Sequence, residues 1–485
     1  MGFQIYKPKL YYSAIFSMLS PFETGWHIGV TNIPEPFIKC WINEVTYGNV
    51  NQTICEDAAN SEDEFLQDEL NNVTLYWSLC TSILAIGAIL GGLIGGPLSD
   101  KYGRKKILTF NSIFASLVCI FLGSARMIGN YPAFVIARTL IGLVIGINSS
   151  ISPVYLSEIA PLSQKGTFCA TYSIGTVFGI FFAQIISLNW VLGTNNFWPI
   201  ALVLGIVPCL CQFILSFFVP ESPVWLMENG YNGDAQLVEI SLKGAVEETS
   251  NLSANSEDKT ETESLLTNII NLVKDPPVRA ALYHIIFFQV VQQLCGFNAL
   301  FFYSGSIFTN AGIPSEYSGL ATVGLGVVNI IGVIIAVAMV GSYGRVNLFF
   351  WSILGVGLCT VAMTVLISFS TEGSVIAYLT ILPTLLYVLI FQLGVGPIPW
   401  MIAVELVPYR YSAGSAAVAA STNWFFAFVV GLCFPPLNDL LDQYVFIIFS
   451  VVCFSSAFYT KMYTVESRGR SIEEVQEIYK LKVEK

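Results

Sequence analysis

Amide side chains gather in one strongly apolar stretch of the sequence, QQLCGFN, where a membrane or a protein core would favour Leu or Val. Gln289, Gln292 and Gln293 are spaced at i, i+3 and i+4, so on a helix they project from one face. Gly296 then weakens the helix, and Asn298 adds a fourth amide. An amide both donates and accepts hydrogen bonds, as a sugar hydroxyl does. This face therefore either binds a hydroxyl-rich ligand or joins neighbouring helices, and the spacing alone favours neither.

Three further amides, Asn329, Gln392 and Asn423, lie within later apolar stretches. Taken singly, such an amide is more typical of a hydrogen bond between membrane helices than of a ligand contact. Together they extend the polar surface that Gln289 begins.

Glycine and proline interrupt another apolar stretch, GVGPIPW, at Gly394, Gly396, Pro397 and Pro399. Proline removes a backbone donor and kinks a helix. A membrane helix tolerates such a break where neighbouring helices or water satisfy the freed groups. The break is either a static kink or a gate that moves.

Two ionisable residues, Glu23 and His27, lie four positions apart in the first apolar stretch. An ionisable side chain at membrane depth is by default a functional candidate, and histidine titrates near physiological pH. Three interpretations stay open: a mutually satisfied pair, a proton-coupling site, or pocket polarity without coupling.

Composition points to a membrane protein without enzymatic machinery. The chain has 485 residues, of which 54% are hydrophobic and 11% charged, whereas soluble domains carry about 25% charged residues. Two distant histidines, with no nucleophile elbow, phosphate loop or metal spacing, argue against an enzyme, a cofactor or a metal. No basic patch indicates a nucleic-acid partner.

The elements that must position these residues are membrane helices, each needing about 20 mostly apolar residues. The sequence predicts an all-α membrane protein with twelve such helices. The spans are expected at 10–32, 74–98, 106–126, 131–157, 166–190, 197–219, 279–308, 316–341, 346–368, 374–403, 411–434 and 441–463. The first is the weakest, because Glu23 and His27 lie within it.

Positive charge sets the expected orientation. The motif DKYGRKK follows the second span, Lys7 and Lys9 precede the first, and Lys165 follows the fourth. Lys and Arg concentrate in cytoplasmic loops, so both termini are expected in the cytoplasm. The acidic loop 33–73 is then extracellular.

That extracellular loop carries two further predictions. Asn51 begins an N-glycosylation sequon. Cys40 and Cys55 both lie in the loop, where an oxidising environment would allow a disulfide between them. The sequence does not fix that pairing.

The chain divides into two related halves. We expect six-helix halves at 1–219 and 279–463, a polar cytoplasmic linker at 220–278, and a cytoplasmic tail at 464–485. Three residue pairs repeat at nearly equal offsets, which indicates an ancient duplication: Arg104 with Arg345, Glu158 with Glu405, and Glu221 with Glu466. In one known transporter plan, two such halves enclose a binding site near the bilayer midplane.

Seven motifs, in order, resemble those of one transporter family: SDKYGRKK, PVYLSEIAP, PESP, QQLCGFNALFFYS, GVGPIPWMIAVEL, NWFFAFVVG and ESRGRSIEEV. With them the chain resembles the sugar porters of the major facilitator superfamily, most closely the facilitative glucose transporters of GLUT type. The resemblance implies the major facilitator fold and sugar contacts at Gln292, Gln293 and Asn298. It also implies a pocket role for Asn329 and a cavity floor formed by Trp400 and Trp424.

The resemblance further implies a salt-bridge latch that closes the cytoplasmic face. Its members would be Asp100, Arg104, Glu158 and Lys165 in the first half, and Arg345, Glu405 and Arg410 in the second. Such a latch biases two conformations because it forms in only one of them. Arg104 and Arg345 would serve equally as topology signals.

The chain departs from the family pattern in its second half and in its pocket. The second-half latch is thinned at Gly341, Val346, Gln392 and Ser412, positions where the family has charged residues. A weaker latch should shift the resting population toward an inward-open state. The pocket differs at Phe302, where a tyrosine is usual, and at Ser173, which replaces a glutamine. These changes bear on affinity and sugar selectivity.

We therefore expect a hexose uniporter in the plasma membrane that works by alternating access. A proton-linked symporter using Glu23 or His27 is the first alternative, since proton-coupled relatives carry a carboxylate where His27 aligns. A sugar sensor that binds without transporting is the second. The expected partners are a small hexose and the lipid bilayer.

Overall fold

The computed structural model describes residues 7–48, 64–161, 165–243, 265–340, 342–408, 411–470 and 472–483. Helices dominate these residues, and the described part of the chain holds no strand. The helices are α1 (Pro8–Gly29), α2 (Glu35–Tyr47), α4 (Glu64–Tyr102), α5 (Arg104–Ile128), α6 (Tyr131–Ile159), α7 (Lys165–Ile186), α8 (Trp198–Val203), α9 (Ile206–Ser216), α10 (Pro223–Glu228), α11 (Asn232–Lys243), α13 (Leu265–Lys274), α14 (Pro276–Leu294), α15 (Phe297–Asn310), α16 (Ser315–Val340), α17 (Arg345–Ser368), α18 (Val375–Leu379), α19 (Ile381–Leu393), α20 (Ile398–Glu405), α21 (Ser412–Leu441), the 3₁₀ turn η3 (Asp442–Tyr444), α22 (Val445–Tyr463) and α23 (Ile472–Val483).

Every span expected from the sequence coincides with a helix or with consecutive helices that a break separates. The sixth span is α8 and α9, the seventh is α14 and α15, and the tenth is α18, α19 and α20. The segment 33–73, expected as the extracellular loop, contains α2 and the first turns of α4. The expected spans end where the hydropathy of the sequence falls. These helices extend into more polar sequence because backbone hydrogen bonds and packing stabilise them there.

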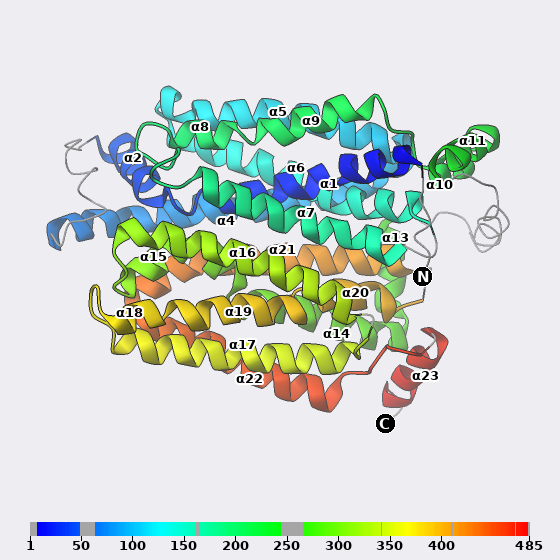
Figure 1. Cartoon of the computed structure of the whole chain (residues 1–485). Coiled ribbons are helices and arrows are strands. Elements are labelled where there is room, and N and C mark those ends of the chain that lie inside the picture. The colour runs from blue at the N-terminus through cyan, green and yellow to red at the C-terminus, as the bar shows by residue number, and fades with distance from the viewer. Residues whose placement is uncertain are drawn as a thin grey trace.

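The long helices run side by side in one bundle (Figure 1). The start of α1 and the C-terminal helix α23 lie at the same end of this bundle, together with α10 and α11 (Figure 1). We call this the termini end. The opposite end carries α2 and α18, and we call it the α2 end (Figure 1).

The bundle consists of two groups of helices. The helices from α1 to α9 pack mainly on one another, and so do those from α14 to α22. The groups meet where α4 packs on α21 and where α7 packs on α16. Glycine allows one of these approaches, because a Cβ added at Gly431 of α21 would lie 3.2 Å from the Cβ of Ser82.

Small residues let the helices of the first group approach closely. On the facing surfaces of α4 and α6 lie Gly87, Gly91, Gly142 and Gly146. A Cβ added at Gly142 would collide with the carbonyl oxygen of Leu84. Close backbone approach through glycine is typical of helix packing in membranes.

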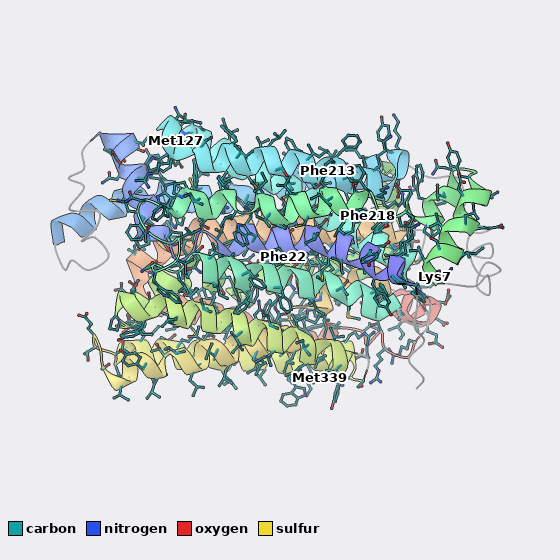
Figure 2. The ribbon with its side chains drawn as sticks, turned by 45° about the horizontal axis from the view of Figure 1, so that its top comes forward. Lys7, Phe22, Met127, Phe213, Phe218 and Met339 are labelled. Carbon is teal, nitrogen blue, oxygen red and sulfur yellow. The ribbon has the colours of Figure 1, made fainter. Side chains whose placement is uncertain are left out.

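The outer surface of the bundle is apolar, as a lipid-facing surface must be. Leu117, Met127, Phe218 and Phe458 are all more than 60% exposed, and Met127 and Phe218 lie on the outside of the bundle (Figure 2). Within the described ranges, nine segments are long and apolar enough to cross a membrane. The helix α1 is not among them, which agrees with its expected weakness.

Candidate functional site

The three glutamines expected to share a helix face form one cluster with two of the predicted asparagines. Gln293 Nε2 donates to Asn423 Oδ1 at 2.9 Å, and Asn298 Nδ2 donates to Gln293 Oε1 at 2.6 Å. Asn423 Nδ2 donates in turn to Gln289 Oε1 at 2.8 Å and to Gln292 Oε1 at 2.6 Å. We call these five residues the amide cluster. It joins α14, α15 and α21.

A break in the seventh span brings Asn298 into this cluster. The helix α14 ends at Leu294, and Gly296 adopts φ +98° before α15 begins at Phe297. This conformation suits glycine, and a Cβ there would also lie 2.7 Å from Cδ2 of Phe449. After this break Asn298 lies among the other amides, where it donates to Gln293.

A second break, in the tenth span, lies directly against the amide cluster. The helix α19 ends at Leu393 and α20 begins at Ile398. The amide nitrogen of Gln292 donates to the carbonyls of Val395 at 2.9 Å and Gly396 at 2.6 Å. The amide nitrogen of Gln289 likewise donates to the Pro399 carbonyl at 3.1 Å.

The members of the amide cluster therefore have different hydrogen-bonding capacity. Both N–H groups of Gln292 are used by the backbone of the break, so this residue joins helices. The described bonds use only one N–H of Gln293 and one of Asn298, and none of them reaches the Asn298 oxygen. Contact between helices thus occupies Gln292, whereas Gln293 and Asn298 keep amide groups that the described bonds do not use.

Two further predicted residues pair beside the second break. Gln392 Nε2 donates to Asn329 Oδ1 at 2.5 Å. Asn329 is fully buried, and among the described residues its Nδ2 has no hydrogen-bond partner. A buried N–H without a partner costs free energy, so this nitrogen remains a donor for a ligand or a water molecule.

The predicted aromatic and serine positions differ in exposure. Trp424 follows Asn423 on α21, is partly buried, and in the described part of the chain its indole N–H has no partner. Trp400 on α20 is 42% exposed. Ser173 on α7 is exposed and belongs to the other group of helices. None of the hydrogen bonds described here joins these three residues to the amide cluster.

Sequence reasoning missed Gln184 of α7. This side chain is fully buried, and neither its amide oxygen nor its nitrogen has a partner among the described residues. It faces α16, because a Cβ added at Gly326 would collide with its Oε1. The sequence did contain a signal for Gln184, because a glutamine is unusual within an apolar span.

The repeated charges of the two halves form two matching networks at the termini end. In the first half, Arg104 pairs with Asp100 at 2.9 Å and with Glu158 at 3.1 Å. The hydroxyl of Ser222 donates to Glu158 at 2.5 Å. In the second half, Arg345 pairs with Glu405 at 3.1 Å, and the hydroxyl of Ser467 donates to Glu405 at 2.8 Å.

A repeated glutamate completes each network, and neither was among the predicted site residues. Glu221 accepts the backbone N–H of Lys105 at 2.9 Å and of Lys106 at 3.3 Å. Glu466 accepts those of Arg345 at 2.7 Å and Val346 at 3.0 Å. Each carboxylate therefore caps the N-terminus of a long helix, where negative charge is favourable. The sequence repeat already aligned Glu221 with Glu466, and this was the signal for their role.

The resemblance implied a salt-bridge latch that closes the cytoplasmic face, and the ion pairs described above differ from such a latch. The ion pairs of Arg104 and Arg345 described above each join elements of a single half. The side chain of Lys165, all of Arg410 and Gly341 lie outside the described residues. Arg104 finds Asp100 one turn away and Glu158 on α6, and Arg345 finds Glu405 on α20, so the partners of these arginines come from neighbouring helices of the same half.

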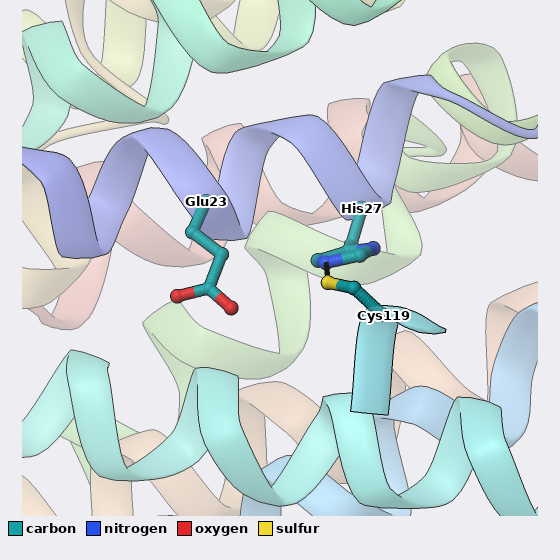
Figure 3. A group of neighbouring side chains, drawn as sticks. All are labelled: Glu23, His27 and Cys119. Atoms are coloured by element: carbon teal, nitrogen blue, oxygen red, sulfur yellow. Dashed lines mark hydrogen bonds between the residues drawn. The ribbon is translucent and has the colours of Figure 1, made fainter. Parts of the chain in front are cut away.

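The predicted pair Glu23 and His27 is buried within the first half. Asn148 of α6 donates to Glu23 Oε2 at 3.0 Å, and the Cys119 sulfur of α5 lies 3.6 Å from His27 Nε2. Figure 3 shows Glu23 and His27 on one helix, with Cys119 directed at the imidazole from another. The hydrogen bonds described for the pair thus lead to other helices, rather than from one member to the other.

Comparison with known proteins decides the family. The family model described as "Sugar (and other) transporter" matches residues 13–479. The chain belongs to the sugar transporter family. It is 30% identical over 480 residues to the solute carrier family 2 facilitated glucose transporter member 3 of Mus musculus, covering 98% of this chain and 94% of that protein. It is 30% identical over 478 residues to the facilitated glucose transporter protein 1 of Caenorhabditis elegans, with 96% and 90% covered.

Solved structures show the same fold. The inward-open conformation of the xylose transporter XylE from E. coli superposes with a TM-score of 0.77 at 20% identity, covering 97% of this chain and 99% of that one. A proton:xylose symporter structure of XylE with bound 6-bromo-6-deoxy-D-glucose gives a TM-score of 0.72 at 19% identity. The sugar transporter described here therefore has the major facilitator fold.

In this sugar transporter the two halves touch at the α2 end. Asn32 Nδ2 donates to the Phe301 carbonyl at 2.5 Å and to Ser304 Oγ at 2.7 Å, while Gly305 N–H donates to Asn32 Oδ1 at 3.1 Å. The hydroxyls of Thr81 and Tyr303 lie 2.6 Å apart. Sequence reasoning missed these residues, since single polar side chains near helix ends carry no spacing signal.

Two predictions fall on residues outside the description. Asn51 lies there, so its glycosylation stays a prediction. Cys40 of α2 is disulfide-bonded, and its partner lies outside the described residues. Cys55 also lies outside them, so its pairing with Cys40 stays a prediction.

Proposed function

We propose that this protein is a transmembrane hexose transporter that works by facilitated diffusion and alternating access. One observation carries the proposal: the break at Gly296 collects Gln293 and Asn298 with unused amide groups beside the broken tenth span. Sugar hydroxyls both donate and accept, so these groups suit a hexose. The facilitated glucose transporters among its relatives support that substrate class.

The proposed arrangement in the membrane follows the fold. We propose twelve spans formed by two six-helix halves, with 220–278 as the linker and both termini in the cytoplasm of a plasma-membrane protein. The cation-rich motif DKYGRKK begins at the termini end, since the Trp225 indole of α10 donates to the Asp100 carbonyl there. Lys and Arg concentrate on the cytoplasmic side of a membrane, so this motif supports a cytoplasmic termini end.

The binding residues are proposed as Gln293, Asn298 and Asn329, with Trp424 lining the same region. Gln289, Gln292, Gln392 and Asn423 would hold these donors in place and seal the backbone break. A hexose would then replace water at the free amide groups. Binding energy comes from several modest hydrogen bonds, each worth about 1 kcal/mol, which suits a ligand that must also be released.

Alternating access is proposed as a rocking of one half against the other. The bonds from Asn32 to α15 hold the α2 end closed, whereas the ion pairs described at the termini end lie within each half. This combination supports an inward-facing state. The broken tenth span is the proposed inner gate. Its backbone carbonyls at the break accept hydrogen bonds from Gln289 and Gln292.

Uptake into liposomes tests the proposal. Purified protein should equilibrate labelled glucose without a pH gradient, and unlabelled hexoses should compete, while protein-free liposomes give the background. Competition by glucose, galactose, fructose and inositol at two pH values would rank the substrates. Uptake that stays at background despite measurable sugar binding would instead indicate a sensor.

Proton coupling is the second candidate, favoured by the buried Glu23 and by the similarity in fold to a proton:xylose symporter. It predicts uptake above equilibrium that requires inward proton flow. Glu23→Gln should then abolish accumulation and spare exchange. Equal uptake with and without the gradient would exclude this candidate.

A further inference from the structure

Three side chains with metal-binding atoms meet inside the first half, and a fourth lies beside them, on the side of α1 that faces α5 and α9. They are Glu23 and His27 of α1, Cys119 of α5 and Cys209 of α9, and each is at most 1% exposed. One ligand atom from each of Glu23, His27 and Cys119 lies within 4.8 Å of the other two (Figure 3). Cys209 lies beside this group of three, and its thiol donates to the Gly205 carbonyl at 3.1 Å, a hydrogen bond that binding of an ion would replace.

The types of atom in this group are those that a transition metal prefers. Sulfur, imidazole nitrogen and carboxylate oxygen together are typical ligands of Zn²⁺ in tetrahedral geometry. With bonds of about 2.3 Å to sulfur and about 2.0 Å to nitrogen, a tetrahedral ion separates these two ligand atoms by roughly 3.6 Å. The distance from Cys119 Sγ to His27 Nε2 is 3.6 Å.

The carboxylate is also held in a way that leaves one oxygen available. Asn148 donates to Glu23 Oε2 at 3.0 Å, and Asn111 donates to Asn148 Oδ1 at 2.9 Å. Glu23 Oε1 is buried and, among the described residues, has no hydrogen-bond partner. A buried carboxylate must be neutralised by a proton or another cation, and supporting hydrogen bonds of this kind orient metal ligands.

We propose that Glu23, His27, Cys119 and Cys209 bind one divalent transition-metal ion of the Zn²⁺ class. Metal binding would release the thiol protons, because a thiolate is the form that binds. Zn²⁺ with the Glu23 carboxylate and two thiolates carries one net negative charge. Arg138, whose guanidinium donates to the His27 carbonyl at 3.2 Å, would balance that charge.

The ion would tie three helices together. It would fix α1 to α5 and to α9, directly beside the break between α8 and α9. Space for the imidazole is provided by Gly205 in that break, because a Cβ there would lie 3.1 Å from His27 Cε1. The proposed metal site lies within the first half and apart from the amide cluster, so it does not depend on the proposed function.

Metal content of the purified protein tests this proposal. The full chain would be produced in cells supplied with Zn²⁺, or with Co²⁺ as a spectroscopic probe, and purified without chelators. We expect close to one ion per chain. The Co²⁺ protein should show the intense d–d bands of a tetrahedral ion at roughly 600–700 nm, together with a thiolate-to-metal charge-transfer band.

Matched variants locate the ion. Cys119→Ser and His27→Gln should each lower the metal content to background, while Cys453→Ser, a fully buried cysteine of α22, should leave it unchanged. Size-exclusion profiles check that each variant is folded. Protein without metal from both media would overturn the proposal and leave Glu23 neutralised by a proton. Metal that persists in both ligand variants would overturn it too, since the ion would then lie elsewhere.

Discussion

Single amides in an apolar helix can join helices or bind a ligand, and within this cluster they differ in how many of their N–H groups are already used. Gln292 gives both of its N–H groups to the backbone of the broken tenth span, whereas Gln293 gives one to Asn423 and keeps one. Gln293 also receives Asn298, so it is the link between α14 and α15. It is therefore the residue at which the proposed ligand binding and the local structure are most directly connected.

Replacing Gln293 with leucine should lower sugar affinity more than stability. The change removes one direct amide contact and the acceptor that orients Asn298, each worth about 1 kcal/mol, so affinity should fall roughly tenfold or more. Sugar binding by isothermal calorimetry and thermal unfolding in detergent would measure both.

Gln212→Leu is the matched control for that experiment. Gln212 is a buried amide of α9 that donates to the Phe16 carbonyl and to Ser20 within the first half. Its replacement should lower thermal stability and leave affinity unchanged. Equal losses of stability in both variants, with affinity intact in both, would show that Gln293 only joins helices.

At the scale of helices, the same device is used twice. Glu221 caps the N-terminus of α5, and Glu466 caps the N-terminus of α17, each through two backbone N–H groups. The residue after each glutamate, Ser222 or Ser467, donates to the glutamate that pairs with the arginine of that half. The segment after each half is thereby bonded to the helix that begins with this arginine, which is α5 in the first half and α17 in the second.

Glu466→Gln and Glu221→Gln should therefore have similar effects. Each change removes the charge from a helix cap that accepts two hydrogen bonds, which should reduce stability by about 1–2 kcal/mol. Chemical denaturation followed by intrinsic tryptophan fluorescence would measure it. Glu477→Gln, at an exposed position of α23, is the control and should change little. A loss in only one of the two variants would contradict the equivalence of the two networks.

At the scale of the whole molecule, described hydrogen bonds join the two halves at the α2 end. At the α2 end, Asn32 makes three hydrogen bonds to α15, and Ser306 donates to Glu35 at 2.8 Å. At the termini end, the ion pairs of Arg104 and Arg345 described above stay within their halves. The balance between inward- and outward-facing states should therefore depend strongly on contacts at the α2 end.

Asn32→Ala should shift that balance toward the outward-facing state. Loss of three bonds removes about 2 kcal/mol of closure, which changes the ratio of the two states roughly thirtyfold. Spin labels at the exposed Tyr47 and Tyr317, one in each half, would report longer distances by pulsed electron resonance. Asn229→Ala, which removes an amide that donates to the Trp225 carbonyl of α10, should leave the distribution unchanged. Unaltered distances in Asn32→Ala would mean that apolar packing alone closes this end.

The periodicity of the sequence by itself predicted many of the helices, the breaks within them and one shared polar face. Runs of apolar residues of membrane length placed the long helices of the bundle, although not α2 or α23, because each membrane helix satisfies its own backbone hydrogen bonds in lipid. Glycine and proline marked the breaks at Gly296 and at Gly394 to Pro399, since both residues act locally. The spacing of the three glutamines predicted a shared face, because helix geometry alone fixes it.

Tertiary structure decided which partners those residues find. Sequence spacing could not show that Gln292 bonds the broken tenth span, that Asn32 closes the α2 end, or that the ion pairs of Arg104 and Arg345 stay within their halves. Cys119 and Cys209 carried no metal-binding spacing with Glu23 and His27, because they come from separate helices far apart in the chain. Contacts of this kind depend on how helices pack, and packing is a property of the whole bundle rather than of any segment.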